Sequence, residues 1–112
     1  MKITVEHMIR GEQTGTVIGF DPVAIVDASA YHDKYEALEY AWRYTNNVVG
    51  SWSKKIGEDA NDDVTVLQER EDGLGLRSSM VGDRFTVEDI FGTSVYSVMP
   101  FGFEKIDGDL LA

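Results

Sequence analysis

The chain has 112 residues, of which 43% are hydrophobic, and it includes two Trp, five Tyr and five Phe. This length and apolar content predict one folded domain spanning residues 1–112. Because the chain contains no Cys, disulfides, thiolate catalysis and Cys-ligated metal centres are excluded. The net charge of −10 opposes direct binding of nucleic acid, whose phosphates require Lys and Arg.

The negative charge is concentrated in the second half of the chain. Residues 1–56 hold six basic and seven acidic side chains, whereas residues 57–112 hold four and thirteen. We interpret this asymmetry either as a solubilising surface or as a surface that attracts a basic groove of a partner protein in place of DNA. No membrane-length apolar run and no secretory signal pattern is present, so a cytoplasmic protein without membrane contact is expected.

The first part of the chain predicts a β-hairpin. Apolar residues alternate with polar ones across residues 2–9, and this period of two is that of a half-buried strand. His7 falls on the apolar side, which is typical of a hydrogen-bonded core histidine. Residues 11–15 predict a turn and residues 16–20 a returning strand, which Pro22 is expected to end.

One amphipathic helix is expected to begin after Asp33. Asp33 and Glu36 have the spacing of a capping box, in which side chains satisfy the first backbone amides of a helix. Residues 46–50 contain two Asn and a Gly, which predict the helix end. The apolar positions that recur at spacings of three or four are Tyr35, Leu38, Ala41, Trp42, Thr45 and Val48.

Further β-rich runs follow at residues 64–67, 84–87 and 94–99. Pro100 is expected to end the last of these or to mark an edge of the sheet, and residues 101–106 predict a final short strand. A single α+β domain is therefore expected, a mostly antiparallel sheet with one principal helix packed on it. The aromatic residues of these runs, most of which are expected in the core, are Phe85, Tyr96, Phe101 and Phe103.

An acidic loop in the second half partly matches a calcium-binding pattern. Asp59, Asn61 and Asp63 have the spacing of the first three ligands of an EF-hand loop. However, Val64 stands where the loop requires Gly, and Arg70 stands where it requires a bidentate Glu. We therefore predict no metal site, and the loop is interpreted as solvated.

The candidate nucleophiles are Ser78 and Ser79, which would need a base such as His7 or His32. Nothing in the spacing brings these residues together, and residues 82–83 are interpreted as a tight turn or bulge that enters the next strand. No phosphate-binding glycine loop is present. We therefore expect no catalytic residue and no cofactor, and a small hydrolase or metal-dependent enzyme is only a third alternative.

Partner binding is assigned to acidic side chains and to one aromatic residue. Trp52, flanked by Ser51 and Ser53, is the candidate for an exposed anchor, because Trp is favoured at interfaces. The alternative is that Trp52 folds back over the helix end. The acidic candidates are Glu58, Asp59, Asp62, Asp63, Glu69, Glu71 and Asp72.

Three segments have a distinctive layout, namely residues 41–47, residues 50–53 and the run Arg77-Ser78-Ser79-Met80-Val81-Gly82-Asp83 before a hairpin and a Gly-Phe pair. This layout resembles that of small accessory proteins encoded by bacteriophages and plasmids. Met80 stands where that family's pattern has a second Ser. The resemblance implies a mobile-element origin, and it implies no reaction.

These observations predict a non-enzymatic accessory protein that binds a host or viral protein. In one form of this prediction the protein is an acidic DNA mimic that inhibits a basic nucleic-acid-handling protein. The alternative is a self-assembling structural or virion-associated protein, in which strand edges and apolar patches mediate homo-oligomers.

Overall fold

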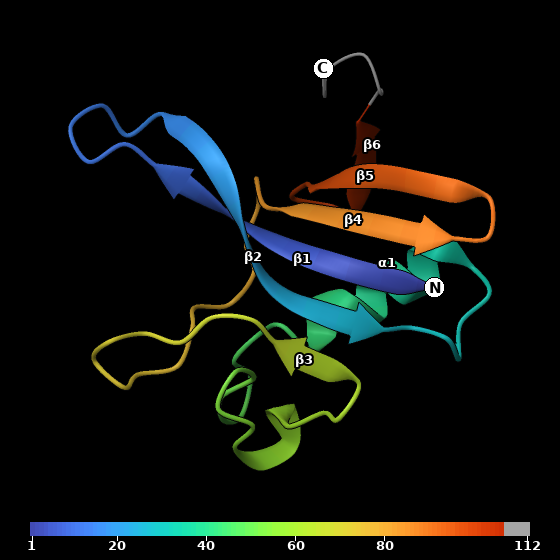
Figure 1. Cartoon of the computed structure of the whole chain (residues 1–112), viewed down its shortest axis with the longest axis horizontal. Coiled ribbons are helices and arrows are strands. Elements are labelled where there is room, and N and C mark those ends of the chain that lie inside the picture. The colour runs from blue at the N-terminus through green and yellow to red at the C-terminus, as the bar shows by residue number, and fades with distance from the viewer. Residues whose placement is uncertain (107–112) are drawn as a thin grey trace.

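The computed structural model describes residues 1–106, which form a six-stranded antiparallel sheet with one α-helix packed against it (Figure 1). The order of the strands is β3-β2-β1-β4-β5-β6, and the α+β class predicted from the sequence is confirmed. The elements are β1 (Lys2–Arg10), β2 (Val17–Asp27), α1 (Lys34–Arg43), the 3₁₀ helix η1 (Gly57–Asp59), β3 (Val64–Val66), β4 (Arg84–Asp89), β5 (Gly92–Val98) and β6 (Phe103–Ile106).

The hairpin of β1 and β2 is longer than predicted, because β2 continues through Pro22 instead of ending there. The pairing shifts between Val5, which lies opposite Ala24, and Glu6, which lies opposite Pro22. Val23 is the extra residue of this bulge. A bulge tolerates proline because the ladder is already interrupted there, so the expectation that Pro22 ends the strand was wrong.

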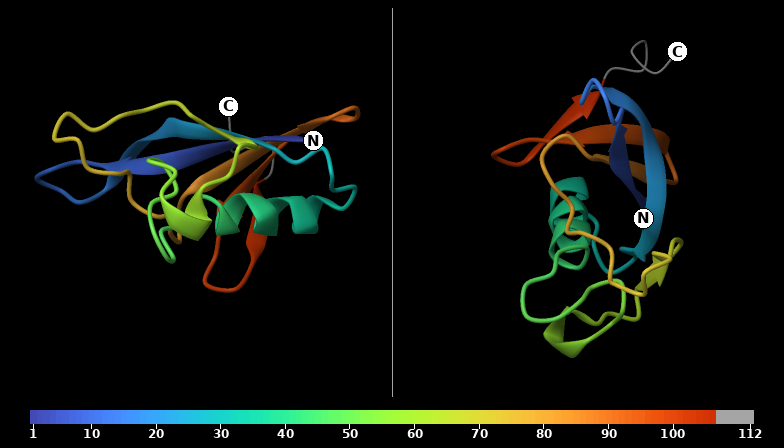
Figure 2. Two further views of the ribbon diagram at one scale, coloured as in Figure 1. Left: turned by 90° about the horizontal axis from the view of Figure 1, so that it is seen from below. Right: turned by 90° about the vertical axis from the view of Figure 1, so that its left-hand side faces the viewer.

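The core lies between one face of the sheet and α1, which runs beneath the sheet in the left view of Figure 2. Ile3 and Val5 of β1 lie opposite Val87 and Phe85 of the neighbouring β4, and all four are fully buried. His7 is buried on the same side of β1. The predicted alternation of the first strand is therefore confirmed from Ile3 to His7.

Helix α1 begins as predicted, since the Asp33 carboxylate accepts a hydrogen bond from the amide of Glu36. Its buried residues are Ala37, Leu38 and Ala41. The apolar stripe expected from Tyr35 to Val48 was therefore partly wrong, because Tyr35 and Val48 are both exposed. Small Ala side chains face the sheet and allow the helix to approach it closely.

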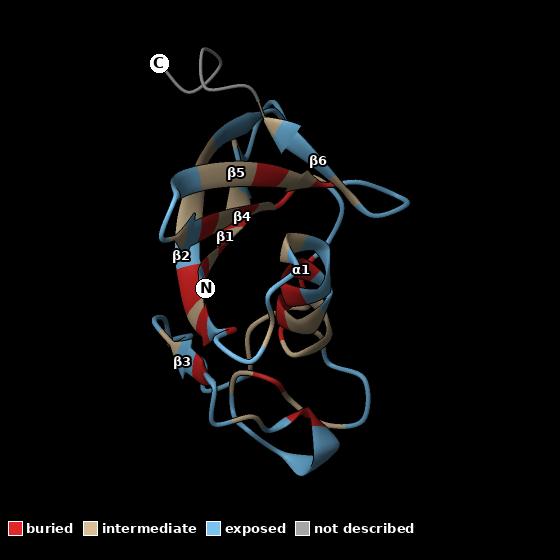
Figure 3. Ribbon diagram, turned by 90° about the vertical axis from the view of Figure 1, so that its right-hand side faces the viewer, coloured by how far each residue is buried: buried red, intermediate tan, exposed pale blue. Residues whose placement is uncertain are grey.

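The opposite face of the sheet is covered by no helix in the described residues (Figure 3), and it carries paired polar side chains. There the Thr86 hydroxyl donates to Glu6, and Lys2 pairs with Glu88. Arg84 lies over the ring of Phe20 with 3.9 Å between its guanidinium carbon and the ring centroid. Such a face is compatible with direct contact with water.

Two of the predicted core aromatics, Phe85 and Tyr96, are buried, and Phe103 is partly buried against them. Phe101 is 97% exposed, so its assignment to the core was wrong. It lies in the turn between β5 and β6 rather than in a strand. Pro100 follows the end of β5, as predicted.

Residues 44–83, here called the irregular segment, connect α1 to β4 with little regular structure. Only η1 and the three-residue strand β3 interrupt its loops. The segment lies beside and below the sheet in Figure 1, where it runs from green to orange. Within residues 1–106, no helix has the length and apolar character needed to cross a membrane.

Candidate functional site

Asp59 lies inside the molecule and organises the beginning of the irregular segment. Its Oδ2 accepts hydrogen bonds from the amides of Val48, Val49 and Gly50 at 2.8, 2.9 and 2.6 Å. Its side chain is fully buried. Asp59 was predicted to be an exposed residue that binds a partner, and the predicted exposure was wrong. The carboxylate is buried because it satisfies three backbone amides that have no partner in α1 or the sheet.

The other oxygen of Asp59 holds the end of α1 in place. Arg43 donates to Asp59 Oδ1 at 3.0 Å and so links the last turn of the helix to η1. Burial alone would raise the pKa of Asp59, but the three amides and the guanidinium outweigh burial and hold the pKa below its usual value. Asp59 is therefore a charged carboxylate with a structural role.

Asp83 plays the same part at the other end of the irregular segment. Arg77 donates to both of its oxygens, at 2.8 and 2.9 Å. The amides of Met8 and Met80 donate to it at 2.9 and 2.8 Å. Burial acts to raise the pKa of Asp83, but Arg77 and these amides lower it overall.

The run from Arg77 to Asp83 thus folds into a closed turn, and its residue types have structural explanations. Gly82 has a positive φ of 97°, which favours glycine, and its amide donates to Val98. A Cβ at this position would lie 3.0 Å from the sulfur of Met8. The prediction of a tight turn before β4 is confirmed.

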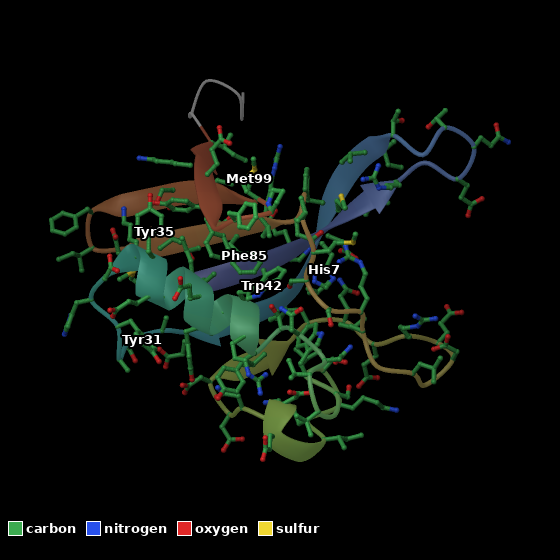
Figure 4. All side chains as sticks on the ribbon, turned by 180° about the vertical axis from the view of Figure 1, so that it is seen from behind. His7, Tyr31, Tyr35, Trp42, Phe85 and Met99 are labelled. Carbon is green, nitrogen blue, oxygen red and sulfur yellow. The ribbon has the colours of Figure 1, made fainter. Side chains whose placement is uncertain are left out.

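His7 and Ser79 lie close together, which the sequence did not indicate. The distance between His7 Nε2 and Ser79 Oγ is 3.2 Å, and Asp83 Oδ2 lies 3.8 Å from the same nitrogen. Figure 4 labels His7 beside the irregular segment. A catalytic triad requires the serine and the carboxylate on opposite nitrogens of the imidazole, so this arrangement is not one.

The direction of the hydrogen bonds also places the proton between His7 and Ser79 on the imidazole. The Thr45 hydroxyl donates to the carbonyl of Ala41, so Ser79, 2.8 Å away, donates to Thr45. The Ser79 hydroxyl then accepts a hydrogen bond from His7 Nε2. Because this nitrogen carries the proton, it cannot act as a base towards Ser79. Burial, followed by the nearby charge of Arg77, lowers the pKa of His7 to about 4.

Trp52 completes this buried cluster. It is 0% exposed, and its Nε1 donates to the carbonyl of Arg77 at 2.9 Å. Its ring meets His7 edge-on, with 6.2 Å between centroids. The expectation of an exposed anchor was wrong, and the alternative, that Trp52 folds back into the molecule, is confirmed. In residues 1–106, every buried side-chain nitrogen or oxygen atom has a hydrogen-bond partner.

The remaining acidic candidates are exposed and form two groups, here called the acidic loops. They lie at the two ends of β3, which separates them along the edge of the sheet. Asp63 accepts from the hydroxyl of Tyr40, and Asp72 pairs with Arg70. Over the described range 1–106, the carboxylates of the other four candidates, Glu58, Asp62, Glu69 and Glu71, have no Lys or Arg within ion-pair distance. The acidic loops comprise Glu58, Asp62 and Asp63, and Glu69, Glu71 and Asp72.

The partial EF-hand pattern does not form a cation site. Asp59 turns inward, Asn61 donates from its amide nitrogen to the Tyr40 hydroxyl, and Asp63 accepts from that hydroxyl. In the part of the chain that the structure describes, no group of three or more His, Asp or Glu side chains is placed to hold a metal ion. The pattern instead reflects local hydrogen bonding.

A groove of about 630 Å³ lies beside the second acidic loop. Lys54 and Arg70 contribute its positive charge, and Leu67, Leu74 and Leu76 its apolar surface. Both cations are already engaged, Lys54 with the carbonyl of Gly73 and Arg70 with Asp72. Their positive charge is therefore used to hold the loop in shape.

The structural roles of Arg43, Arg77 and Asp83 were missed in the sequence, although Asp83 beside Gly82 at the start of a β-run was a signal of a buried turn residue. The chain matches no protein-family model, no curated protein and no solved structure.

Proposed function

We propose that this protein is a non-catalytic accessory protein that binds a basic protein through its acidic loops. The observation that carries the proposal is that two of the segment's carboxylates, Asp59 and Asp83, are buried and hold the backbone in place, while six others are exposed at the two ends of β3. Loops held by a rigid scaffold are a common means of presenting side chains to a partner.

The charge of the surface supports a protein partner over nucleic acid. On the open face of the sheet, Lys2 is paired with Glu88 and Arg84 lies over Phe20. Binding to phosphates depends on basic side chains that displace counterions. A partner whose own groove binds nucleic acid has the positive charge that the acidic loops complement, so DNA mimicry is the finer form of the proposal.

The resemblance of the run from Arg77 to Asp83 to phage and plasmid accessory proteins supports an origin on a mobile element. In this chain the run's Arg, Ser, Gly and Asp residues stabilise a turn. The resemblance therefore concerns the fold of this segment, and the partner is inferred from the charged surface. The proposal places the encounter in the cytoplasm of the host cell.

The test compares two variants of equal charge. Glu58→Gln, Glu69→Gln and Glu71→Gln together remove three charges from the acidic loops, and Glu12→Gln, Glu36→Gln and Glu104→Gln remove three exposed charges elsewhere. We expect wild-type protein to capture a basic protein from host lysate at low salt and to lose it at high salt.

In the same assay, the acidic-loop variant should lose capture by about tenfold, while the control variant retains it. Equal losses in the two variants would show that only net charge matters. Failure of the wild-type protein to capture any partner at either salt concentration would contradict the proposal.

Self-assembly is the second candidate, and it is favoured by exposed apolar side chains in the turns of the sheet. Ile90 and Phe91 lie in the turn between β4 and β5 and are almost fully exposed. However, the edge strands β3 and β6 have only three and four residues, and short edges resist pairing with a second sheet. A concentration-dependent oligomeric mass in light scattering would favour self-assembly.

A further inference from the structure

The turn between β5 and β6 holds one phenylalanine in an exposed and constrained position. Phe101 is 97% exposed, and the turn projects past α1 on the helix side of the sheet (Figure 3). The amide of Met99 donates to the carbonyl of Gly102 at 3.0 Å, and Gly102 has a φ of 77°. Pro100 restricts the backbone immediately before Phe101. An aromatic side chain held in this way loses little backbone entropy when it is buried in an interface.

A groove of about 380 Å³ lies directly beside this turn. Trp42 of α1 forms one wall, and Met99, Pro100 and Phe103 contribute apolar surface from the β5–β6 hairpin. Figure 4 labels Trp42, which belongs to the helix, and Met99, which directly follows β5. A projecting aromatic ring beside an apolar groove has the character of an interface hot spot.

The charge around this groove limits what can occupy it. Glu39 is the one charged side chain among the lining residues, and no Lys or Arg lines the groove in the described part of the chain. Arg43, the next cation along α1, is engaged by Asp59. A second copy docked about a two-fold axis would bring the two Glu39 carboxylates and two chains of charge −10 together. The charge therefore favours a positively charged occupant.

We propose that Phe101 and this groove form a docking site for a basic amphipathic segment of the partner protein. The apolar side chains of the segment would contact Trp42, Met99 and Phe103, and its Lys or Arg would approach Glu39. This inference rests on the proposed function, because it supplies the apolar contacts that the acidic loops lack. The loops then act on the rate of encounter, and the groove acts on the lifetime of the complex.

The test uses a synthetic peptide of Leu and Lys with the Leu residues at helical spacing, and a scrambled peptide of the same composition. Binding is measured by calorimetry at low and at physiological salt. The exposed residue Phe101 is changed to Ser, and the control is Phe91→Ser, an almost equally exposed phenylalanine at the other end of β5. Because both side chains are exposed, both variants should fold as the wild type does.

We expect Phe101→Ser to weaken binding of the amphipathic peptide by tenfold or more, and Phe91→Ser to leave it unchanged. The scrambled peptide should bind more weakly and should not distinguish the two variants. Equal affinities in Phe101→Ser and wild type would overturn the proposal. The proposal would also be overturned if the wild type is a dimer, and if Phe101→Ser abolishes the dimer without affecting peptide binding. The occupant of the groove would then be a second copy of the chain.

The two proposals fail in different ways. If the variant with Gln at positions 58, 69 and 71 captures the lysate partner as well as the wild type does, the role of the acidic loops is wrong. Loss of peptide binding in Phe101→Ser would in that case still support the groove. Conversely, a salt-sensitive capture that depends on the loops but not on Phe101 would keep the proposed function and overturn the groove.

Discussion

Two regions of this molecule are stabilised by different kinds of contact. The sheet and α1 share an apolar core in which Ile3, Val5 and Phe85 are fully buried. The irregular segment instead depends on two buried carboxylates, Asp59 and Asp83, which accept from three and two backbone amides respectively and from one guanidinium each. Buried carboxylates thus take over the role that strand and helix hydrogen bonds play in the rest of the fold.

The largest expected effect on stability comes from removing a buried charge from the irregular segment. In Asp83→Asn, Arg77 loses its bidentate partner and the buried amides of Met8 and Met80 face a neutral side chain. We expect the free energy of unfolding to fall by about 3 kcal/mol, as measured by urea denaturation. The exposed pair of Asp72 and Arg70 provides the control, and Asp72→Asn should leave the denaturation midpoint nearly unchanged. Equal effects of the two substitutions would remove the distinction between the regions.

The next effect concerns pH and the contact between the two regions at His7. The pKa of His7 is about 4 in the folded protein, below that of the unfolded chain, so the unfolded state binds the proton first as pH falls. The stability contributed by neutral His7 is therefore complete above about pH 6.5 and is lost progressively towards pH 4, by about 3 kcal/mol in total.

This pH dependence is measured by urea denaturation at several pH values. A His7→Asn variant is the control and should show a flatter profile over the same interval, although its stability at neutral pH will be lower. A wild-type profile that is flat between pH 6.5 and 4 would show that His7 is not held in its neutral form.

A smaller effect is expected for the indole hydrogen bond of Trp52. Trp52→Phe keeps an aromatic ring in the core but leaves the carbonyl of Arg77 without its donor. The expected loss is about 1 to 2 kcal/mol in the free energy of unfolding. Thermal denaturation measures it. The emission that the variant loses relative to the wild type is the contribution of Trp52 beside that of Trp42, and it should have the short wavelength of a buried indole. An unchanged melting temperature would mean that this hydrogen bond does not help to hold the segment.

The first region could be predicted from the sequence because its signals are local. The alternation of β1 and the Asp33 cap of α1 depend on residues only two or three positions apart, and both were found. The continuation of β2 through Pro22 was missed, because it depends on a bulge formed with β1. Local patterns predict elements, and they do not show where a partner strand shifts its register.

Most of the buried contacts of the irregular segment could not be predicted, because they join residues that are distant in sequence. Asp59 and Trp52 lie in polar stretches that predict solvent exposure, yet the carboxylate binds amides about ten positions earlier and the indole binds a carbonyl at residue 77. Ser79 and His7 are separated by 72 positions. The six residues of the acidic loops were assigned to the surface correctly, because within residues 1–106 none of their side chains turns into the interior as that of Asp59 does.

Amide hydrogen exchange at residues 48–50 tests most directly whether a buried carboxylate holds the irregular segment. These amides donate to Asp59 and belong to no helix or strand. We expect them to exchange as slowly as amides in the centre of β1, because they are released only when the segment opens cooperatively. Exchange at the rate of an exposed loop would show that Asp59 does not hold the segment.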